Sequence, residues 1–243
     1  MLMKIYGRAF NVLMKKPLKL WGLSLLFVAL STVLPVLCGV AIPALGLAVV
    51  MLLSTSMTMV FLYGYRGENV KVVQLFSCFK DWQTIKRVVF GMAWMGLWIF
   101  LWGLIPVVGP IFSLIRTYEY RLTPYILVTE PDVCLTDAIK LSSERTKGYK
   151  LQMWLADFVH AAIFAVAFLI ISLLAKIPYI GILFTLVLVI LCIVYFALVA
   201  LFAGLVQAAF YEEITSGSSK CSSCGAKLAT GAEFCSSCGK PVN

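Results

Sequence analysis

Long apolar segments dominate this chain and restrict the folds that it can adopt. Of its 243 residues, 62% are hydrophobic and 13% are charged, whereas a soluble domain has about 45–50% apolar and about 25% charged residues. A globule of this size cannot bury so much apolar surface inside itself, so lipid must cover much of it. The composition therefore predicts an all-α polytopic membrane protein.

A helix needs about 20 apolar residues to cross a bilayer, and six segments approach or exceed that length. The first two are contiguous, and we expect Pro35, Gly39 and Pro43 to make the turn between them. No small-residue cleavage site follows the first segment, which should therefore remain as a span. The six predicted spans, arranged as three hairpins, are 18–40, 41–65, 88–105, 107–128, 154–175 and 179–211.

The positions of the basic residues predict the orientation. The formal charge is +9, but lysines and arginines cluster between the apolar segments, so nucleic acid is not an expected partner. With six spans, only Lys176 of the 20 basic residues falls on the opposite side. The positive-inside rule then places both termini in the cytoplasm. A five-span alternative, with 88–115 as one kinked helix, would leave the basic stretch 116–150 outside.

The three hairpins resemble one another. Short turns at 34–39, 105–109 and 177–181 each contain a proline, with spacings of 71 and 72 residues. A basic segment with helical periodicity precedes each hairpin and is expected to lie in the cytoplasmic headgroup layer or beneath the spans. Turns of this kind are also common without a repeat, so both explanations stay open. The three amphipathic segments are 4–15, 70–79 and 136–147.

Four motifs give the chain a family resemblance. Residues 118–131 read Tyr-Glu-Tyr-Arg-Leu-Thr-Pro-Tyr-Ile-Leu-Val-Thr-Glu-Pro, 138–143 read Ala-Ile-Lys-Leu-Ser-Ser, 147–150 read Lys-Gly-Tyr-Lys, and 208–212 read Ala-Ala-Phe-Tyr-Glu. This pattern resembles a bacterial family of integral membrane proteins of unknown function, related to the membrane domain attached to some glycerophosphodiester phosphodiesterases.

The resemblance covers about residues 1–214 and implies a membrane fold in a bacterial plasma membrane, but no reaction. One departure is that Thr129-Glu130 stands where the family often has Asp-Asn before the proline. We expect residues 1–214 to form the membrane domain, 215–220 a flexible linker, and 221–243 a separate C-terminal domain.

That C-terminal segment contains two Cys-x-x-Cys-Gly motifs, a spacing typical of a zinc ribbon. Four thiolates can surround one Zn²⁺ tetrahedrally, and the glycine after each pair permits the tight turn that brings the two sulfurs together. Disulfides are disfavoured in a reducing cytoplasm. A closed site of four cysteines is structural, and in so short a segment the metal supplies folding energy. The predicted ligands are Cys221, Cys224, Cys235 and Cys238.

Several charged or titratable residues fall inside predicted spans. Arg116 and Glu119 are three residues apart on the fourth span and can pair, with Arg121 beside them. Asp157 and His160 lie one turn apart on the fifth span. Such groups can form a gate, a substrate site, a lipid-headgroup site or a proton relay, or they can simply lock the helices together.

No nucleophile–base pair, catalytic carboxylate pair or His-Glu-x-x-His motif is present in the sequence, so we expect no enzymatic activity. The first functional hypothesis is a scaffold or sensor that recruits a protein partner through the cytoplasmic ribbon. The alternative is a transporter or channel for a small solute or lipid, using the charges of the fourth span. So small a chain would need to form a homo-oligomer to enclose a path.

Overall fold

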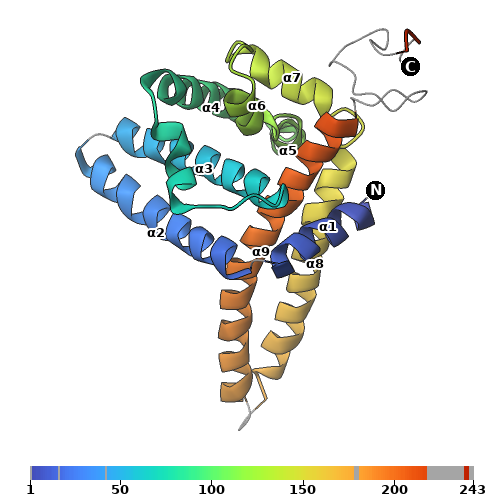
Figure 1. The fold of residues 1–243 in the computed structure, drawn as a ribbon. Coiled ribbons are helices and arrows are strands. Elements are labelled where there is room, and N and C mark those ends of the chain that lie inside the picture. Colours follow the sequence, from blue (N-terminus) through green and yellow to red (C-terminus); the bar gives the residue numbers. More distant parts are fainter. Residues whose placement is uncertain (1, 16, 42, 178–180, 218–237, 241–243) are drawn as a thin grey trace.

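The computed structural model describes residues 2–15, 17–41, 43–177, 181–217 and 238–240, and these residues contain helices but no strand. The chain forms long helices joined by shorter ones (Figure 1). The fold is therefore all-helical, as the composition predicts. The helices are α1 Leu2–Lys15, α2 Pro17–Ala41, α3 Pro43–Tyr65, η1 Val72–Phe79, α4 Trp82–Gly103, α5 Gly109–Glu119, α6 Thr123–Thr129, α7 Asp137–Arg145, α8 Lys150–Leu174 and α9 Gly181–Gly217.

The three predicted amphipathic segments are α1, η1 and α7. In α1 the apolar face is buried at Ile5 and Ala9, while Arg8 at its edge is exposed. This face packs against α9, so α1 is part of the helical core. The second segment is a 3₁₀-helix instead of an α-helix. α7 is followed by Gly148, whose positive φ of 84° lets the chain leave the helix and enter α8.

The predicted turn at Pro35 is wrong. Proline lacks an N–H and crowds the carbonyl four residues earlier, yet α2 continues through Pro35 to Ala41. The helix break comes later, and α3 begins at Pro43. A proline is well tolerated in the first turn of a helix, where its missing N–H would have no helical partner.

The predicted fourth span, 107–128, is also wrong as a single helix. It is divided into α5, of 11 residues, and α6, of 7 residues. The break precedes Pro124, whose ring excludes the carbonyl of Tyr120 from a continuous helix. α5 spans only about 16 Å at 1.5 Å per residue, half of the hydrocarbon core of a bilayer. The single kinked helix 88–115 of the five-span alternative is not formed either, because α4 ends at Gly103 and α5 begins at Gly109.

The turns before α5 and α9 have the same construction. The amide N of Gly109 donates to Ile105 O at 2.8 Å, and that of Gly181 donates to Ile177 O at 2.9 Å. A Cβ on Gly109 would lie 2.6 Å from Gly103 O, and one on Gly181 would lie 2.3 Å from Ala175 O. Only glycine permits these approaches. The two turns support a shared hairpin design for the second and third units.

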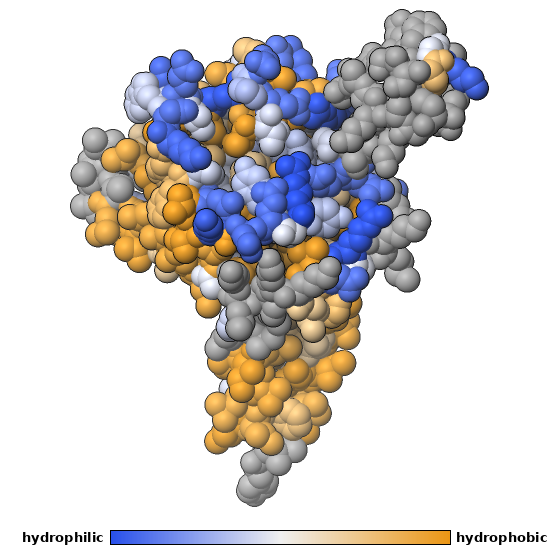
Figure 2. All heavy atoms as spheres, viewed as in Figure 1, coloured by the Kyte–Doolittle hydropathy of each residue, from blue (hydrophilic) through white to orange (hydrophobic). Residues whose placement is uncertain are grey.

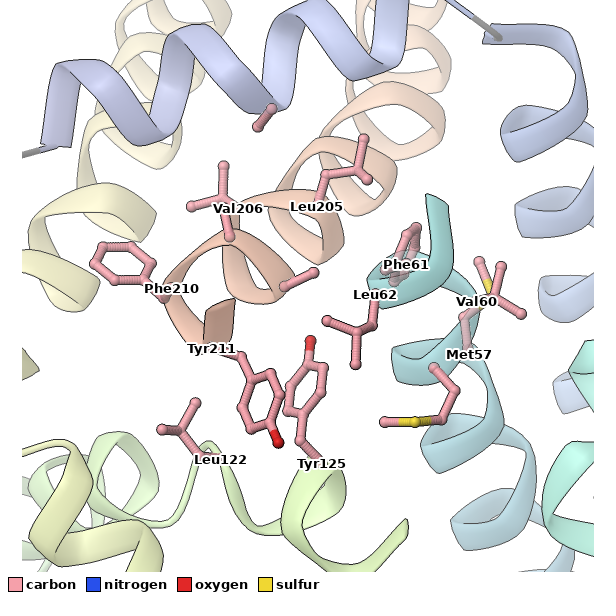
Figure 3. Packing of buried hydrophobic residues seen from close by; sticks show 14 of the residues in the cluster. Met57, Val60, Phe61, Leu62, Leu122, Tyr125, Leu205, Val206, Phe210 and Tyr211 are labelled. Carbon is pink, nitrogen blue, oxygen red and sulfur yellow. The ribbon is translucent and has the colours of Figure 1, made fainter. Parts of the chain in front are cut away.

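The hydrophobic core lies where α3 and α9 cross. Figure 3 shows Phe61 and Leu62 of α3 facing Leu205 of α9, with Tyr125 of α6 stacked on Tyr211 of α9. The two tyrosine rings are 4.6 Å apart and nearly parallel, at 13°. We call this region, formed by 52–62, 123–129 and 201–214 together with α1 and α7, the junction.

Away from the junction the surface is apolar. Figure 2 shows hydrophobic residues covering the end of the α8–α9 hairpin, while polar residues gather around the junction. Exposed side chains there include Ile163, Leu169 and Ile182. We call residues 158–174 of α8 and 181–192 of α9 the apolar arm. The α2–α3 hairpin extends from the junction in a different direction (Figure 1).

Among the described residues, four helices are long and apolar enough to cross a membrane. They are α3, α4, α8 and the segment Leu20–Leu37 of α2. The apolar part of α9 whose side chains are described, Gly181–Cys192, is shorter than a full span. Length and hydropathy thus support membrane insertion for four of the six predicted spans.

Candidate functional site

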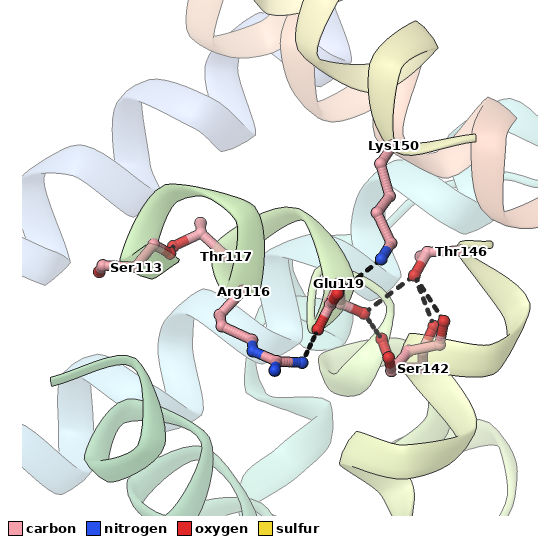
Figure 4. Close-up of polar contacts among 8 residues, drawn as sticks. Ser113, Arg116, Thr117, Glu119, Ser142, Thr146 and Lys150 are labelled. Atoms are coloured by element: carbon pink, nitrogen blue, oxygen red, sulfur yellow. Dashed lines mark hydrogen bonds and ion pairs between the residues drawn. The ribbon is translucent and has the colours of Figure 1, made fainter. Parts of the chain in front are cut away.

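The break between α5 and α6 brings together the charged residues that the sequence placed on one span. The helix stops after Glu119, and the turn at 120–122 exposes backbone groups that α5 and α6 cannot satisfy alone. α7 satisfies them: Ser142 Oγ donates to Glu119 O at 2.7 Å and accepts from Leu122 N at 3.1 Å. Thr146 Oγ1 also donates to Glu119 O, at 3.2 Å. Two buried hydroxyls thus join α7 to the break (Figure 4).

The Glu119 carboxylate is the centre of an ion-pair group. Its side chain is 8% exposed and accepts from Arg116, as the three-residue spacing predicts, and also from Lys150 at the start of α8. Figure 4 shows the two cations approaching from opposite sides. The Arg116 guanidinium also stacks over the Trp102 ring, 4.6 Å from its centroid. Two cations share one carboxylate, so the group has a net positive charge.

A second ion pair joins the break to α8. Arg121 Nη1 donates to Asp157 Oδ2 at 2.6 Å, and Tyr118 Oη donates to the same oxygen at 3.1 Å. Asp157 of the predicted fifth span thus pairs with Arg121 of the predicted fourth span. The side chain of His160, its predicted partner, lies outside the described part of the structure. A cavity of about 10 Å³ beside Arg121 and Asp157 has room for about one water molecule.

The end of α9 is held to the junction by residues for which the sequence predicted no partner. Glu212 pairs with Arg66 at the end of α3, and Glu213 pairs with Arg8 of α1 at 3.2 Å. Tyr211 Oη and Thr129 Oγ1 share a hydrogen bond of 2.9 Å. Tyr211 and Glu212 belong to the 208–212 motif that carries part of the family resemblance. That motif was the available signal, but it could not identify partners so distant in sequence.

The unusual Thr129-Glu130 pair has a defined place. The Glu130 carboxylate accepts two hydrogen bonds from Arg145 at the end of α7, one of them 2.9 Å long. Arg87 of α4 donates to Leu127 O at 2.9 Å and to Glu130 O at 2.7 Å. α6 is therefore held by arginines from α4 and α7, one on each side.

The zinc ribbon lies mostly beyond the described residues. Cys221, Cys224 and Cys235 fall outside them, whereas Cys238 is described and exposed. Gly239, which follows the last cysteine, has a positive φ of 70°, the backbone conformation expected after a metal-binding Cys-x-x-Cys turn. Within the described residues no three His, Cys, Asp or Glu side chains group closely enough to hold a metal.

Comparison with known families agrees with this assignment of the tail. Residues 220–242 match the model of the zinc-ribbon domain family. The match contains all four predicted ligands. Neither the search of curated proteins nor that of solved structures found a match. The C-terminal domain is thus a zinc ribbon by family, and zinc-ribbon domains typically bind zinc.

Proposed function

We propose that this protein is a non-enzymatic scaffold or sensor of the bacterial plasma membrane, which recruits a protein partner through a cytoplasmic zinc ribbon. The observation that carries the proposal is the course of α9. This helix of 37 residues starts in the apolar arm, passes through the junction and ends at Gly217, so that the first three residues of the predicted linker 215–220 are helical. A change in the helices of the membrane domain can therefore reach the ribbon through one continuous element.

The junction makes that connection firm. Near its end α9 pairs through Glu212 and Glu213 with two other helices, and its Gly204 packs against the Phe61 ring. The free end of a helix usually frays, but these contacts hold this one. The ribbon is thus attached to the core of the protein, and only the short linker separates the two.

The proposed topology places the α2–α3 and α8–α9 hairpins across the bilayer. α4 enters, and the broken α5–α6 segment returns to the same side, so both termini are cytoplasmic. This arrangement keeps the basic stretch 116–150 on the cytoplasmic side, as the positive-inside rule requires. Lys150 begins α8 on that side, where water and lipid headgroups can solvate it, and from there it reaches Glu119 at the break.

In the ribbon the donor set fits a structural Zn²⁺. Cys221, Cys224, Cys235 and Cys238 would hold it as thiolates, and the ion would supply the folding energy that so short a segment lacks. The +70° φ of Gly239 supports this fit.

The alternative function, transport of a small solute or lipid, draws its support from Arg121, Asp157 and the small cavity between them. Each of the charges in this region has an opposite charge close by, which favours a role in holding the helices together. A homo-oligomer or an opened state would be needed to form a path.

A pull-down from membranes tests the recruitment proposal. The tagged full-length protein should capture a cytosolic protein after crosslinking, and Cys221→Ser with Cys224→Ser should abolish both this capture and the bound zinc. The matched control is Ser222→Ala with Ser223→Ala, which changes the same loop without removing a ligand. Equal capture by the two double variants would contradict the proposal, as would purified protein that contains no zinc.

A further inference from the structure

A groove runs between α4, α5 and α7 on the membrane domain. It consists of two adjoining hollows of about 330 and 300 Å³ that share Arg116 and Lys140. One end is lined by Trp94, Trp98 and Trp102, which follow one another at four-residue spacing on α4. The function proposed above does not use this feature. We call it the α4–α7 groove.

The chemistry of the groove changes along its length. At the other end the lining residues are Ser143, Glu144 and Lys147 of α7 and the turn after it. Arg116 and Lys140 lie between this polar end and the tryptophans. The groove is therefore apolar and aromatic at one end, and from its middle to the other end it is polar with an excess of cations, which matches a molecule with an apolar chain and an anionic head.

The charges favour an anionic head over a neutral one. The cavity walls contain three cations and the single carboxylate of Glu144. Lys140 also pairs with Asp137 at 2.9 Å, and Arg116 with Glu119, but Glu119 is shared with Lys150. Including these partners, four cations face three carboxylates. An anion in the groove would complete the neutralisation.

We propose that the α4–α7 groove binds an anionic phospholipid of the surrounding bilayer. The phosphate lies between Arg116, Lys140 and Lys147, and an acyl chain runs along Trp94, Trp98 and Trp102. Tryptophan suits this position because its ring is apolar and its N–H can reach the headgroup layer. The ion-pair group at the α5–α6 break thereby senses the lipid that surrounds the protein. The inference rests on membrane insertion as proposed above, and it is independent of the ribbon.

Tryptophan quenching tests the site in the full-length protein. Replacing Trp21, Trp82 and Trp154 with Phe leaves only the three groove tryptophans of the six. This protein is reconstituted into vesicles that contain either phosphatidylglycerol or phosphatidylcholine with brominated chains, diluted in unlabelled phosphatidylcholine. Quenching should reach half its maximum at a lower mole fraction of brominated phosphatidylglycerol than of brominated phosphatidylcholine. Each basic residue near an anionic headgroup should contribute about fivefold to this preference.

The variants change the preference in opposite directions. Lys140→Gln with Lys147→Gln should remove most of the preference for the anionic lipid, whereas Glu144→Gln should increase it. The matched control is Lys71→Gln with Lys80→Gln, two exposed lysines away from the groove, which should leave the preference unchanged. Helical circular dichroism shows whether each variant is folded, and the Glu144 variant tests the site even where the lysine variant fails to fold.

The outcomes separate the two proposals. Failure to insert into either kind of vesicle would overturn the membrane function and, with it, the lipid site. Insertion with equal quenching by both lipids would overturn only the lipid site. Loss of the preference in millimolar inorganic phosphate would identify a site for a free anion instead of a lipid. Absence of quenching by either lipid, together with a dimer on size exclusion, would mean that a second copy covers the groove.

Discussion

The junction and the apolar arm remove apolar side chains from water in different ways. In the junction the protein buries its own apolar side chains: 11 of the 23 residues of α3 are buried, and its partner α9 is buried at Leu205 and Phe210. Among the described side chains of residues 158–174, the part of α8 in the apolar arm, none is buried. Burial is favourable in proportion to the apolar area removed from water, so the arm needs lipid to supply what the junction obtains from neighbouring helices.

This difference also separates the polar groups. Around the junction carboxylates meet cations from distant parts of the chain, as Glu119 meets Lys150, whereas in the arm the hydroxyls of Ser172 and Thr185 donate to carbonyls of their own helix. Long-range polar bonds specify which helices are neighbours, and local ones do not. The junction is therefore expected to determine the fold, and the arm to determine insertion.

The largest expected effect is at Glu119. Glu119→Gln keeps the shape of the side chain but leaves Arg116 and Lys150 without their shared carboxylate. Loss of a buried partner should lower the free energy of unfolding by about 3 kcal/mol, the lower end of the usual range, because both cations are about one-third exposed. Unfolding by denaturant in mixed micelles measures this change in the free energy of unfolding.

Glu144→Gln is the control for that measurement, since this carboxylate is on the same face of the protein but exposed. Its effect on stability should be within about 0.5 kcal/mol. Equal effects of the two substitutions would mean that the ion pairs of Glu119 do not stabilise the fold.

The next effect in size is at the crossing of α3 and α9. A Cβ on Gly204 would lie 2.2 to 2.6 Å from three atoms of the Phe61 ring, so Gly204→Ala forces the two helices apart. Overpacking of this kind should cost about 1–3 kcal/mol. Gly96→Ala is the matched control on α4, where a Cβ meets nothing within 4 Å. It should stabilise the helix by up to about 1 kcal/mol. A stabilising Gly204→Ala would show that the crossing is not closely packed.

Sequence patterns predicted the helical fold, because hydropathy and periodicity are properties of the local sequence. A helix that faces lipid is apolar along its length, so these local properties are enough to identify it. They failed at Pro35 and at 120–122 for opposite reasons. A proline among apolar neighbours can be accommodated inside α2, whereas Pro124 follows charged residues that gain partners when the helix stops. The local sequence contains the proline in both places, but only the tertiary contacts decide what it does.

Only the part of the candidate site that depends on local helical spacing was predictable from the sequence. Arg116 and Glu119 lie three residues apart on one helix, so their pairing follows from helical geometry alone. Lys150 and Ser142 reach the same residue from 31 and 23 positions away, and no periodicity connects positions so distant. Their roles depend on how α7 docks against the break, which is a property of the assembled junction.

The smallest expected effect is at Asp81, an exposed carboxylate at the start of α4 that contrasts with buried Glu119. Thr84 donates to it twice, from Oγ1 and from the backbone N, each at 2.8 Å. These bonds favour the charged form and lower the pKa of the Asp81 carboxyl. A lowered pKa contributes stability that is complete above the pKa of the unfolded chain, about 3.9, and is lost as the pH falls through the folded value.

The difference in melting temperature between the wild type and Asp81→Asn should therefore fall as the pH is lowered from about 6 to about 2. Because Asn can still accept the bond from the Thr84 amide, only the charge-dependent part of the cap is removed, and the difference should be small throughout. The other groups that titrate in this range are common to both proteins, so their effects cancel in this comparison. A difference that grew at low pH would show that the Asp81 carboxyl is stabilised in its neutral form.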